Sequence, residues 1–351
     1  MAIQNYSTVT ARIGKLKGEI LAHAMPVEVL GITGMQKQMP KNQSDTVVFR
    51  RYLPYGGTDN KWITGSNVGT FATDHITQEG VTPSADTLSA TDTTVALQQY
   101  SVLYAVTDKT VDLYEDDVPS EMKKQTGERI GLVREMVRYG ALKACTNAFY
   151  AGGSSVATTD ETLTLNFLRK IARNLLANHA KQITSILAAS PNFATAPVEA
   201  GFLVFVSTDM EPAIRDLPGF KHVSEYGSRK PVHEMEVGSV ERFRFIASPE
   251  LAPTLGASGV TAAVGTTGLY DSASSGYVDV YPCIVVAEDA WGQVALRGMD
   301  SIDVTYLPPG QKDKNDPLGQ RGYIGAKTYM AASVLNNGWM ALAYAGTPSL
   351  A

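Results

Sequence analysis

The 351-residue sequence contains little cysteine and no long apolar segment. Cys145 and Cys283 are its only cysteines, and one possible pair is too few for a disulfide framework. No stretch approaches the ~18 consecutive apolar residues of a membrane-spanning helix, and the N-terminus lacks the apolar core of a secretion signal. We therefore expect a protein made in a reducing cytoplasm, with no membrane partner.

An excess of positive charge is also missing. The chain has 30 Lys and Arg residues against 35 Asp and Glu residues, which gives a formal net charge of −5. Proteins that bind nucleic acid through its phosphates usually present a basic surface. The sequence therefore predicts that any neighbouring DNA is held loosely and without sequence specificity.

Recognisable catalytic and metal-binding patterns are absent. The histidines stand in separate segments, without His or Cys partners at the spacing of metal ligands: His23, His75, His179, His222 and His233. The sequence also lacks a nucleophile elbow, a Walker loop and a dinucleotide-binding glycine pattern. We therefore predict no catalytic residue, no metal ligand and no cofactor site, and we expect the protein not to be an enzyme.

Three polar segments could be mistaken for sites. Residues 115–117, Glu-Asp-Asp, precede a predicted helix, where carboxylates usually cap the first turn. Residues 152–155, Gly-Gly-Ser-Ser, are expected to stop that helix rather than to hold a phosphate. Residues 313–316 resemble the start of a calcium loop, but the glycine and the glutamate that such a loop requires are missing. A solvated turn is therefore the prediction there.

The composition is that of an ordered protein with two or three modules. Hydrophobic residues make up 44% of the chain and charged residues 19%, which favours a buried core over disorder. Residues 8–24 show the spacing of one amphipathic helix. Residues 46–53 and 94–107 are rich in β-branched and aromatic residues, the second with a break in its alternation, and predict two strands that pair antiparallel. The polar segment 55–94 between them is expected to project as a loop that needs an outside partner.

Residues 119–150 have the most regular spacing of apolar residues in the chain. Pro119 suits a first helical turn, and Ile130, Val133 and Val137 recur at helical spacing, so we predict one amphipathic helix over residues 119–150. Such a helix is roughly 48 Å long at ~1.5 Å per residue. Its charged residues are expected to lie mostly off the apolar stripe. The stripe should pack on the apolar, strand-like segment 323–344 near the C-terminus.

Residues 161–300 predict a separate α/β module. We expect helices at residues 166–180 and 211–216, and buried strands at residues 201–207, 242–247 and 281–286. The apolar run 323–344 is interrupted by Asn336-Asn337-Gly338, which marks a turn. The fold class is therefore α+β.

The order of several short segments resembles the major capsid family of podovirus-like (N4-type) tailed bacteriophages. The resemblance covers nearly the whole chain and rests on these segments: 30–31 (LG), 39–42 (MPKN), 46–52 (TVVFRRY), 79–83 (EGVTP), 99–100 (QY), 107–113 (TDKTVDL), 218–220 (PGF), 280–282 (VYP), 288–292 (EDAWG), 316–323 (DPLGQRGY) and 327–329 (KTY).

This resemblance implies the Hong Kong 97 type of capsid fold. Residues 1–45 would form an N-terminal arm and residues 46–106 an extended β-hairpin loop that overlies a neighbouring subunit. Residues 107–160 would form the peripheral domain with its long spine helix, residues 161–300 the axial domain, and residues 301–351 strands that return to the peripheral domain.

The resemblance also implies a function. Copies of the chain would assemble into hexamers and pentamers of an icosahedral shell that encloses double-stranded DNA without sequence-specific binding. The protein would be made in the bacterial cytoplasm and reside in the virion capsid, with a portal and separate scaffolding or decoration proteins as further partners. Two alternatives remain open at this point, an encapsulin-like protein nanocompartment and an α+β hydrolase.

Overall fold

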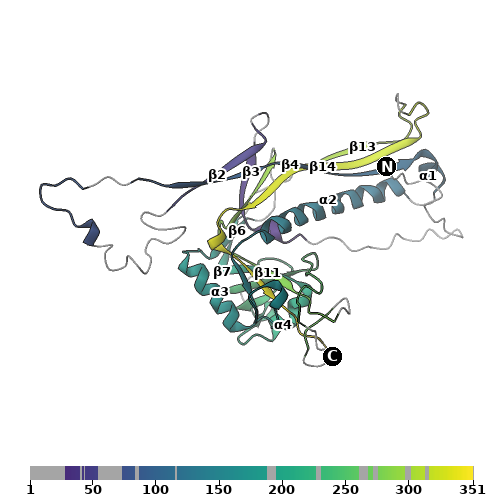
Figure 1. Cartoon of the computed structure of the whole chain (residues 1–351). Coiled ribbons are helices and arrows are strands. Elements are labelled where there is room, and N and C mark those ends of the chain that lie inside the picture. Colours follow the sequence, from purple (N-terminus) through teal and green to yellow (C-terminus); the bar gives the residue numbers. More distant parts are fainter. Residues whose placement is uncertain are drawn as a thin grey trace.

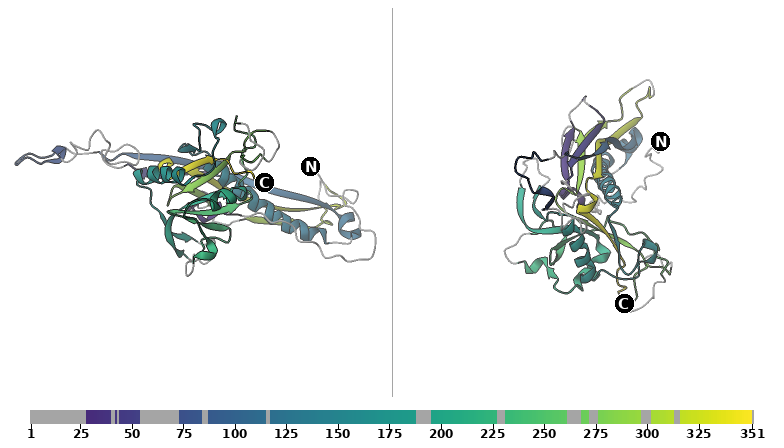
Figure 2. Two further views of the ribbon diagram at one scale, coloured as in Figure 1. Left: turned by 90° about the horizontal axis from the view of Figure 1, so that it is seen from below. Right: turned by 60° about the vertical axis from the view of Figure 1, so that its left-hand side comes forward.

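The computed structural model describes residues 28–39, 42, 44–53, 73–83, 87–114, 117–187, 195–226, 231–260, 268–271, 276–296, 302–312 and 316–350. The helix predicted over residues 8–24 lies outside these ranges. A compact body carries a long helix and sheet that extend to one side (Figure 1). A β-hairpin extends to the other side, as two further views confirm (Figure 2). The secondary structure is mixed α and β, with more strand than helix.

The body is built on an eight-stranded sheet. Its strand order is β5-β15-β11-β7-β10-β9-β8, with β6 paired to β7. Each residue of β10 and β11 is buried, because helices and loops cover both faces of these central strands. The strands are β5 (Ala148–Tyr150), β6 (Ile183–Leu187), β7 (Thr195–Ser207), β8 (Lys221–His222), β9 (Glu236–Val240), β10 (Phe243–Ser248), β11 (Tyr281–Val286) and β15 (Met340–Ala345).

The predictions for residues 161–300 are confirmed at the level of these elements. Helix α3 (Leu165–Ala177) begins where the Thr164 side chain accepts a hydrogen bond from the Phe167 N–H, and helix α4 spans Glu211–Arg215. The apolar face of α3, with Ile171 and Leu175 fully buried, packs on side chains of β7 and β10 in one core. The predicted strands correspond to the C-terminal half of β7, to β10 and to β11.

A second sheet of five strands forms the long extension together with helix α2. Strand β14 (Arg321–Val334) pairs along one side with β4 (Gln98–Thr107) over ten residue pairs. Along its other side lie β12 (Trp291–Leu296) and β13 (Asp303–Leu307), and β1 (Met35–Met39) pairs parallel to β12. The short helix α1 (Asp108–Leu113) follows β4 directly. The sheet thus brings segments from the two ends of the chain side by side.

Helix α2 (Val118–Lys143) lies along this sheet (Figure 1). Ile130 is fully buried and packs with Val102 of β4 and Ala326 of β14, and Val133 lies partly buried against the same cluster. The predicted packing of the helix on the C-terminal strand is therefore confirmed for these two positions. No helix within the described residues is long and apolar enough to cross a membrane.

The predicted C-terminal end of this helix is wrong. The helix ends at Lys143, and residues 148–150 form β5, which pairs parallel with β15. Between them the Thr146 N–H donates to Asn337 Oδ1 and the Asn147 amide donates to the Met340 carbonyl. Cys, Thr and Asn have low helix propensity, so these contacts with the C-terminal segment outweigh continuation of the helix.

The C-terminal run divides as its turn signal predicts. Asn336 accepts a hydrogen bond from the Gly338 N–H, and this turn separates β14 from β15. Strand β14 lies on α2, whereas β15 pairs antiparallel with β11 in the body. The segment 301–351 therefore contributes strands to both sheets, because the turn redirects the chain from one sheet to the other.

Residues 28–39, which the family resemblance assigns to the N-terminal arm, are packed into the protein. Val29 and Leu30 are fully buried, and β1 is a strand of the second sheet. The chain passes closely over Trp291, whose Nε1 donates to Thr33 Oγ1 at 3.1 Å. Gly34 makes this approach possible, because it has a φ of +96° and a Cβ there would lie 2.6 Å from the Trp291 ring.

The predicted antiparallel hairpin is confirmed only in part, because residues 94–96 of the predicted second strand pair with β2, whereas residues 98–107 pair with β14. β2 (Thr46–Tyr52) pairs with β3 (Ala90–Ala96) in continuous register, Thr46 opposite Ala96 and Tyr52 opposite Ala90. The predicted break in the second strand falls at Leu97, where the chain leaves β2 and continues as β4 against β14. Residues 54–72 and 84–86 of the predicted projecting loop lie outside the described ranges.

Candidate assembly surfaces

The described residues of the polar segments singled out in the sequence form hydrogen bonds with nearby groups of the chain. Asp117 caps α2 by accepting from the Ser120 N–H at 3.2 Å, while Glu115 and Asp116 lie outside the described residues. The hydroxyl of Thr158 accepts from both the Ser154 and the Ser155 N–H at 3.0 Å, so these N–H groups are already bonded. The segment 152–155 follows β5 and not, as predicted, the end of the long helix.

The third segment is described only in part. Asp313 and Asn315 lie outside the described ranges. Asp316 Oδ2 accepts from the Arg321 N–H at 2.8 Å, which fits a turn that leads into β14. Within the described residues, no group of three or more His, Cys, Asp or Glu side chains is arranged to hold a metal ion.

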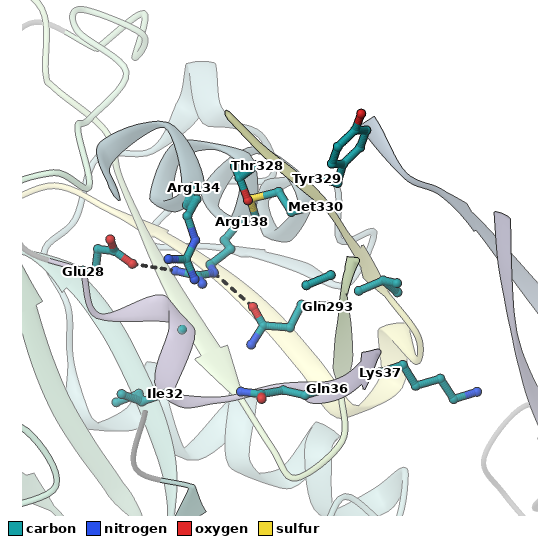
Figure 3. A pocket seen from close by; sticks show the side chains of 13 residues that line it. Glu28, Ile32, Gln36, Lys37, Arg134, Arg138, Gln293, Thr328, Tyr329 and Met330 are labelled. Carbon is teal, nitrogen blue, oxygen red and sulfur yellow. Dashed lines mark hydrogen bonds and ion pairs between the residues drawn. The ribbon is translucent and has the colours of Figure 1, made fainter. Parts of the chain in front are cut away.

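A buried ionic cluster joins the N-terminal segment to α2, and sequence reasoning missed it. Glu135 is fully buried, and its Oε1 accepts from the Val29 and Leu30 N–H groups, both at 2.8 Å. Arg138, also buried, donates to Glu135 at 3.3 Å and to Glu28 at 3.1 Å. Its Nε reaches Gln293 of β12 at 3.1 Å, and Figure 3 shows this guanidinium between Glu28 and Gln293. The cluster thus connects α2 to two other segments.

Burial governs the protonation of this cluster. Desolvation raises the pKa of Glu135 above its ordinary value, while the two backbone N–H groups and Arg138 oppose the rise. A carboxylate that accepts from two N–H groups at the start of a segment is a capping arrangement. The cluster therefore holds residues 28–30 against α2 and β12.

Beside the cluster lies a cavity of about 130 Å³. Gln36, Gln293, Arg134 and Arg138 are among its lining residues, and Lys37 and Tyr329 point away from it in Figure 3. At ~30 Å³ per molecule, the space suits a few ordered waters. It is smaller than the ~300 Å³ at which ligand pockets usually begin.

The hairpin of β2 and β3 projects from the body of the protein (Figure 1). Phe49 of β2 and Val95 of β3 are buried at its root, packed with residues of β1, β12 and β14. Beyond the root, Tyr52, Ile76, Val81 and Leu88 are exposed. These four side chains are left uncovered within the single chain.

Comparisons with known proteins agree with this geometry. No protein-family model matches the sequence. The chain is 22% identical over 273 residues to the major capsid protein of Pseudomonas phage KPP21, a match that covers 70% of this chain and 65% of the relative. The matched region thus spans just under two thirds of that relative's length.

Solved capsid structures match over almost the full chain. The capsid of Ralstonia phage GP4 aligns with a TM-score of 0.64 at 9% identity, covering 97% of this chain and 96% of that chain. The capsid of cyanophage Pam1 aligns with a TM-score of 0.60 at 12% identity, covering 99% of this chain and 100% of that chain. The capsid of cyanophage P-SCSP1u aligns with a TM-score of 0.58 at 14% identity, covering 95% of this chain and 93% of that chain. The chain therefore has the fold of bacteriophage capsid proteins, with mixed α and β structure.

Proposed function

We propose that this chain is the major capsid protein of a tailed bacteriophage, a structural subunit that assembles with copies of itself into the shell of the virion. The observation that carries the proposal is the match of 97% of the chain to a phage capsid structure with a TM-score of 0.64. The sequence similarity to a phage major capsid protein supports it independently. The chain is a building block and not an enzyme.

Within this proposal the fold is of the Hong Kong 97 type and the family is the N4-type. Residues 1–45 act as the N-terminal arm, residues 46–106 as the extended loop, residues 107–160 as the peripheral domain with α2 as its spine, and residues 161–300 as the axial domain. Residues 301–351 return to the peripheral domain as β13 and β14 and then continue into the sheet of the body as β15. Strand β15 pairs with β5 on one side and with β11 on the other, which ties the peripheral and axial parts into one sheet.

The proposed assembly consists of hexamers and pentamers in an icosahedral shell around double-stranded DNA. Its partners are further copies of the chain, a portal and separate scaffolding or decoration proteins. Heterologous contacts, in which one subunit's loop clasps the next, close such rings. An isolated two-stranded ribbon is marginally stable in water, so the hairpin gains order from the neighbouring subunit.

The alternatives are not favoured. An encapsulin-like shell would enclose protein cargo, whereas the capsid neighbours reported above are those of phages. A hydrolase would require a catalytic constellation, and the polar segments described above serve as caps and turns.

Electron microscopy of the purified chain tests the proposal. We expect closed shells from the full-length protein. A variant in which a short Gly-Ser linker replaces residues 55–86 keeps both strands of the hairpin, and should remain soluble and folded but form no shells. Normal shells from this variant would contradict the clasping role. Full-length protein that stays monomeric under all assembly conditions would contradict the shell function itself.

A further inference from the structure

Strand β13 is an exposed edge of the long sheet (Figure 1). It pairs with β14 on one side, and within the described part of the chain no other strand pairs with it. All five of its residues are exposed, yet Val304, Tyr306 and Leu307 are apolar, at 63%, 41% and 42% exposure. An exposed apolar edge strand presents unpaired backbone groups to another strand.

The two faces of β13 differ. Successive side chains of a strand point to opposite faces. Lys123 of α2 lies over the Tyr306 ring at 4.0 Å from its centroid, so Tyr306 and Val304 are on the face that α2 covers. Asp303, Thr305 and Leu307 are on the other face. A partner strand must therefore offer apolar groups on the α2 side.

The strand is complementary to itself. In an antiparallel pair centred on Thr305, Thr305 lies opposite the same residue of the second copy, and Val304 lies opposite Tyr306 twice. Threonine pairs and pairs of an aromatic with a β-branched residue are favourable across strands. Asp303 lies opposite Leu307, so no like charges face each other. A two-fold axis through this pair also places both α2 helices on the same face of one continuous sheet.

We propose that β13 pairs antiparallel with β13 of a second copy of this chain, centred on Thr305, and that this pairing joins neighbouring subunits. The inference rests on the proposed shell function, because a shell brings many identical copies into contact. The occupant is a second copy rather than a foreign strand, since the chain itself supplies the matching sequence. The contact is isologous, unlike the head-to-tail contact of the hairpin.

Disulfide trapping tests the register. Thr305→Cys should form covalent dimers in assembled shells under mild oxidation, seen on a non-reducing gel. Asp303→Cys is the matched control on the same face: in this register the two copies of residue 303 are four residues apart along the strands, about 13 Å. That exceeds the ~7 Å limit for a disulfide. Both native cysteines are buried, so wild-type shells should give little background.

The outcomes separate this inference from the proposed function. Wild-type shells that form while Thr305→Cys shells give no dimer would overturn the pairing and leave the shell function standing. Equal dimer from Asp303→Cys, or crosslinking of residue 305 only to a different protein, would also overturn it. If Thr305→Cys fails to assemble, Val304→Lys and Leu255→Lys provide the comparison, since both add a lysine at an exposed apolar position. Val304→Lys should destabilise shells to heat, and equal heat stability of the two variants would refute the pairing.

Discussion

Replacing Glu135 with alanine should detach the N-terminal segment from α2 and lower the stability of the whole protein. The substitution removes the acceptor of the Val29 and Leu30 N–H groups, which belong to fully buried residues. Each buried donor left without a partner costs about 1–3 kcal/mol. Arg138 also loses one of its two carboxylate partners and keeps Glu28. Removing one member of a buried ion pair costs about 3–5 kcal/mol.

Because these contributions overlap, we expect a total loss of about 3–5 kcal/mol in the free energy of unfolding. That is a large share of the roughly 5–15 kcal/mol of a typical domain. Urea denaturation of wild type and variant in the same assembly state measures it. Lys124→Ala on the same helix is the control, because its ion pair with Glu121 is exposed and surface pairs contribute about 0–1 kcal/mol. A loss below about 1 kcal/mol for Glu135→Ala would refute the anchoring role.

The same carboxyl predicts a pH dependence. Burial raises the pKa of Glu135, so the folded protein holds this proton more tightly than the unfolded chain. The stability from this group is therefore fully present at pH values below its unfolded-state pKa and is lost as the pH rises through its folded-state pKa. Relative to Glu135→Gln, which does not titrate, wild type should gain stability as the pH falls from 7. If the free energy of unfolding of wild type minus that of Glu135→Gln stays constant or falls as the pH is lowered, the sign of this prediction is wrong.

Three further predictions follow from single contacts. Ile130→Ala should cost about 2–5 kcal/mol in urea denaturation, because it opens a cavity between α2 and the sheet. Gly34→Ala should lower the melting temperature measured by calorimetry, since a Cβ there meets Trp291 at 2.6 Å and the φ of +96° disfavours alanine. Cys145 and Cys283 should not react with a thiol reagent until the protein is denatured, because both are buried and burial raises both pKa values, that of Cys283 to about 12. Rapid labelling of either cysteine in the native protein would contradict this last prediction.

Local patterns predicted most of the elements. The β-branched and aromatic residues of segment 46–53 and the apolar run of residues 281–286 correspond to β2 and β11, and Pro119 lies in the first turn of α2. The end of α2 was missed because Asn147 bonds to the Met340 carbonyl, a partner 193 residues away that no local pattern reveals.

The ionic cluster was missed for a related reason. Glu135 and Arg138 lie off the apolar stripe of α2, and charged residues in such positions are usually solvated. Their burial depends on residues 28–30 covering a second face of the helix.

The contacts at the root of the hairpin couple it to this cluster. Phe49 and Val95 pack on Met39 at the end of β1, and β1 continues from the segment that Glu135 holds. A force on the hairpin is therefore transmitted into β1 and β12, whose Gln293 contacts Arg138. Close-packed interiors have few voids and transmit strain. In the proposed shell, contacts of a neighbouring subunit with the hairpin would therefore act on the same sheet that α2 packs against. Glu135→Ala should then weaken assembly, although Glu135 itself is fully buried.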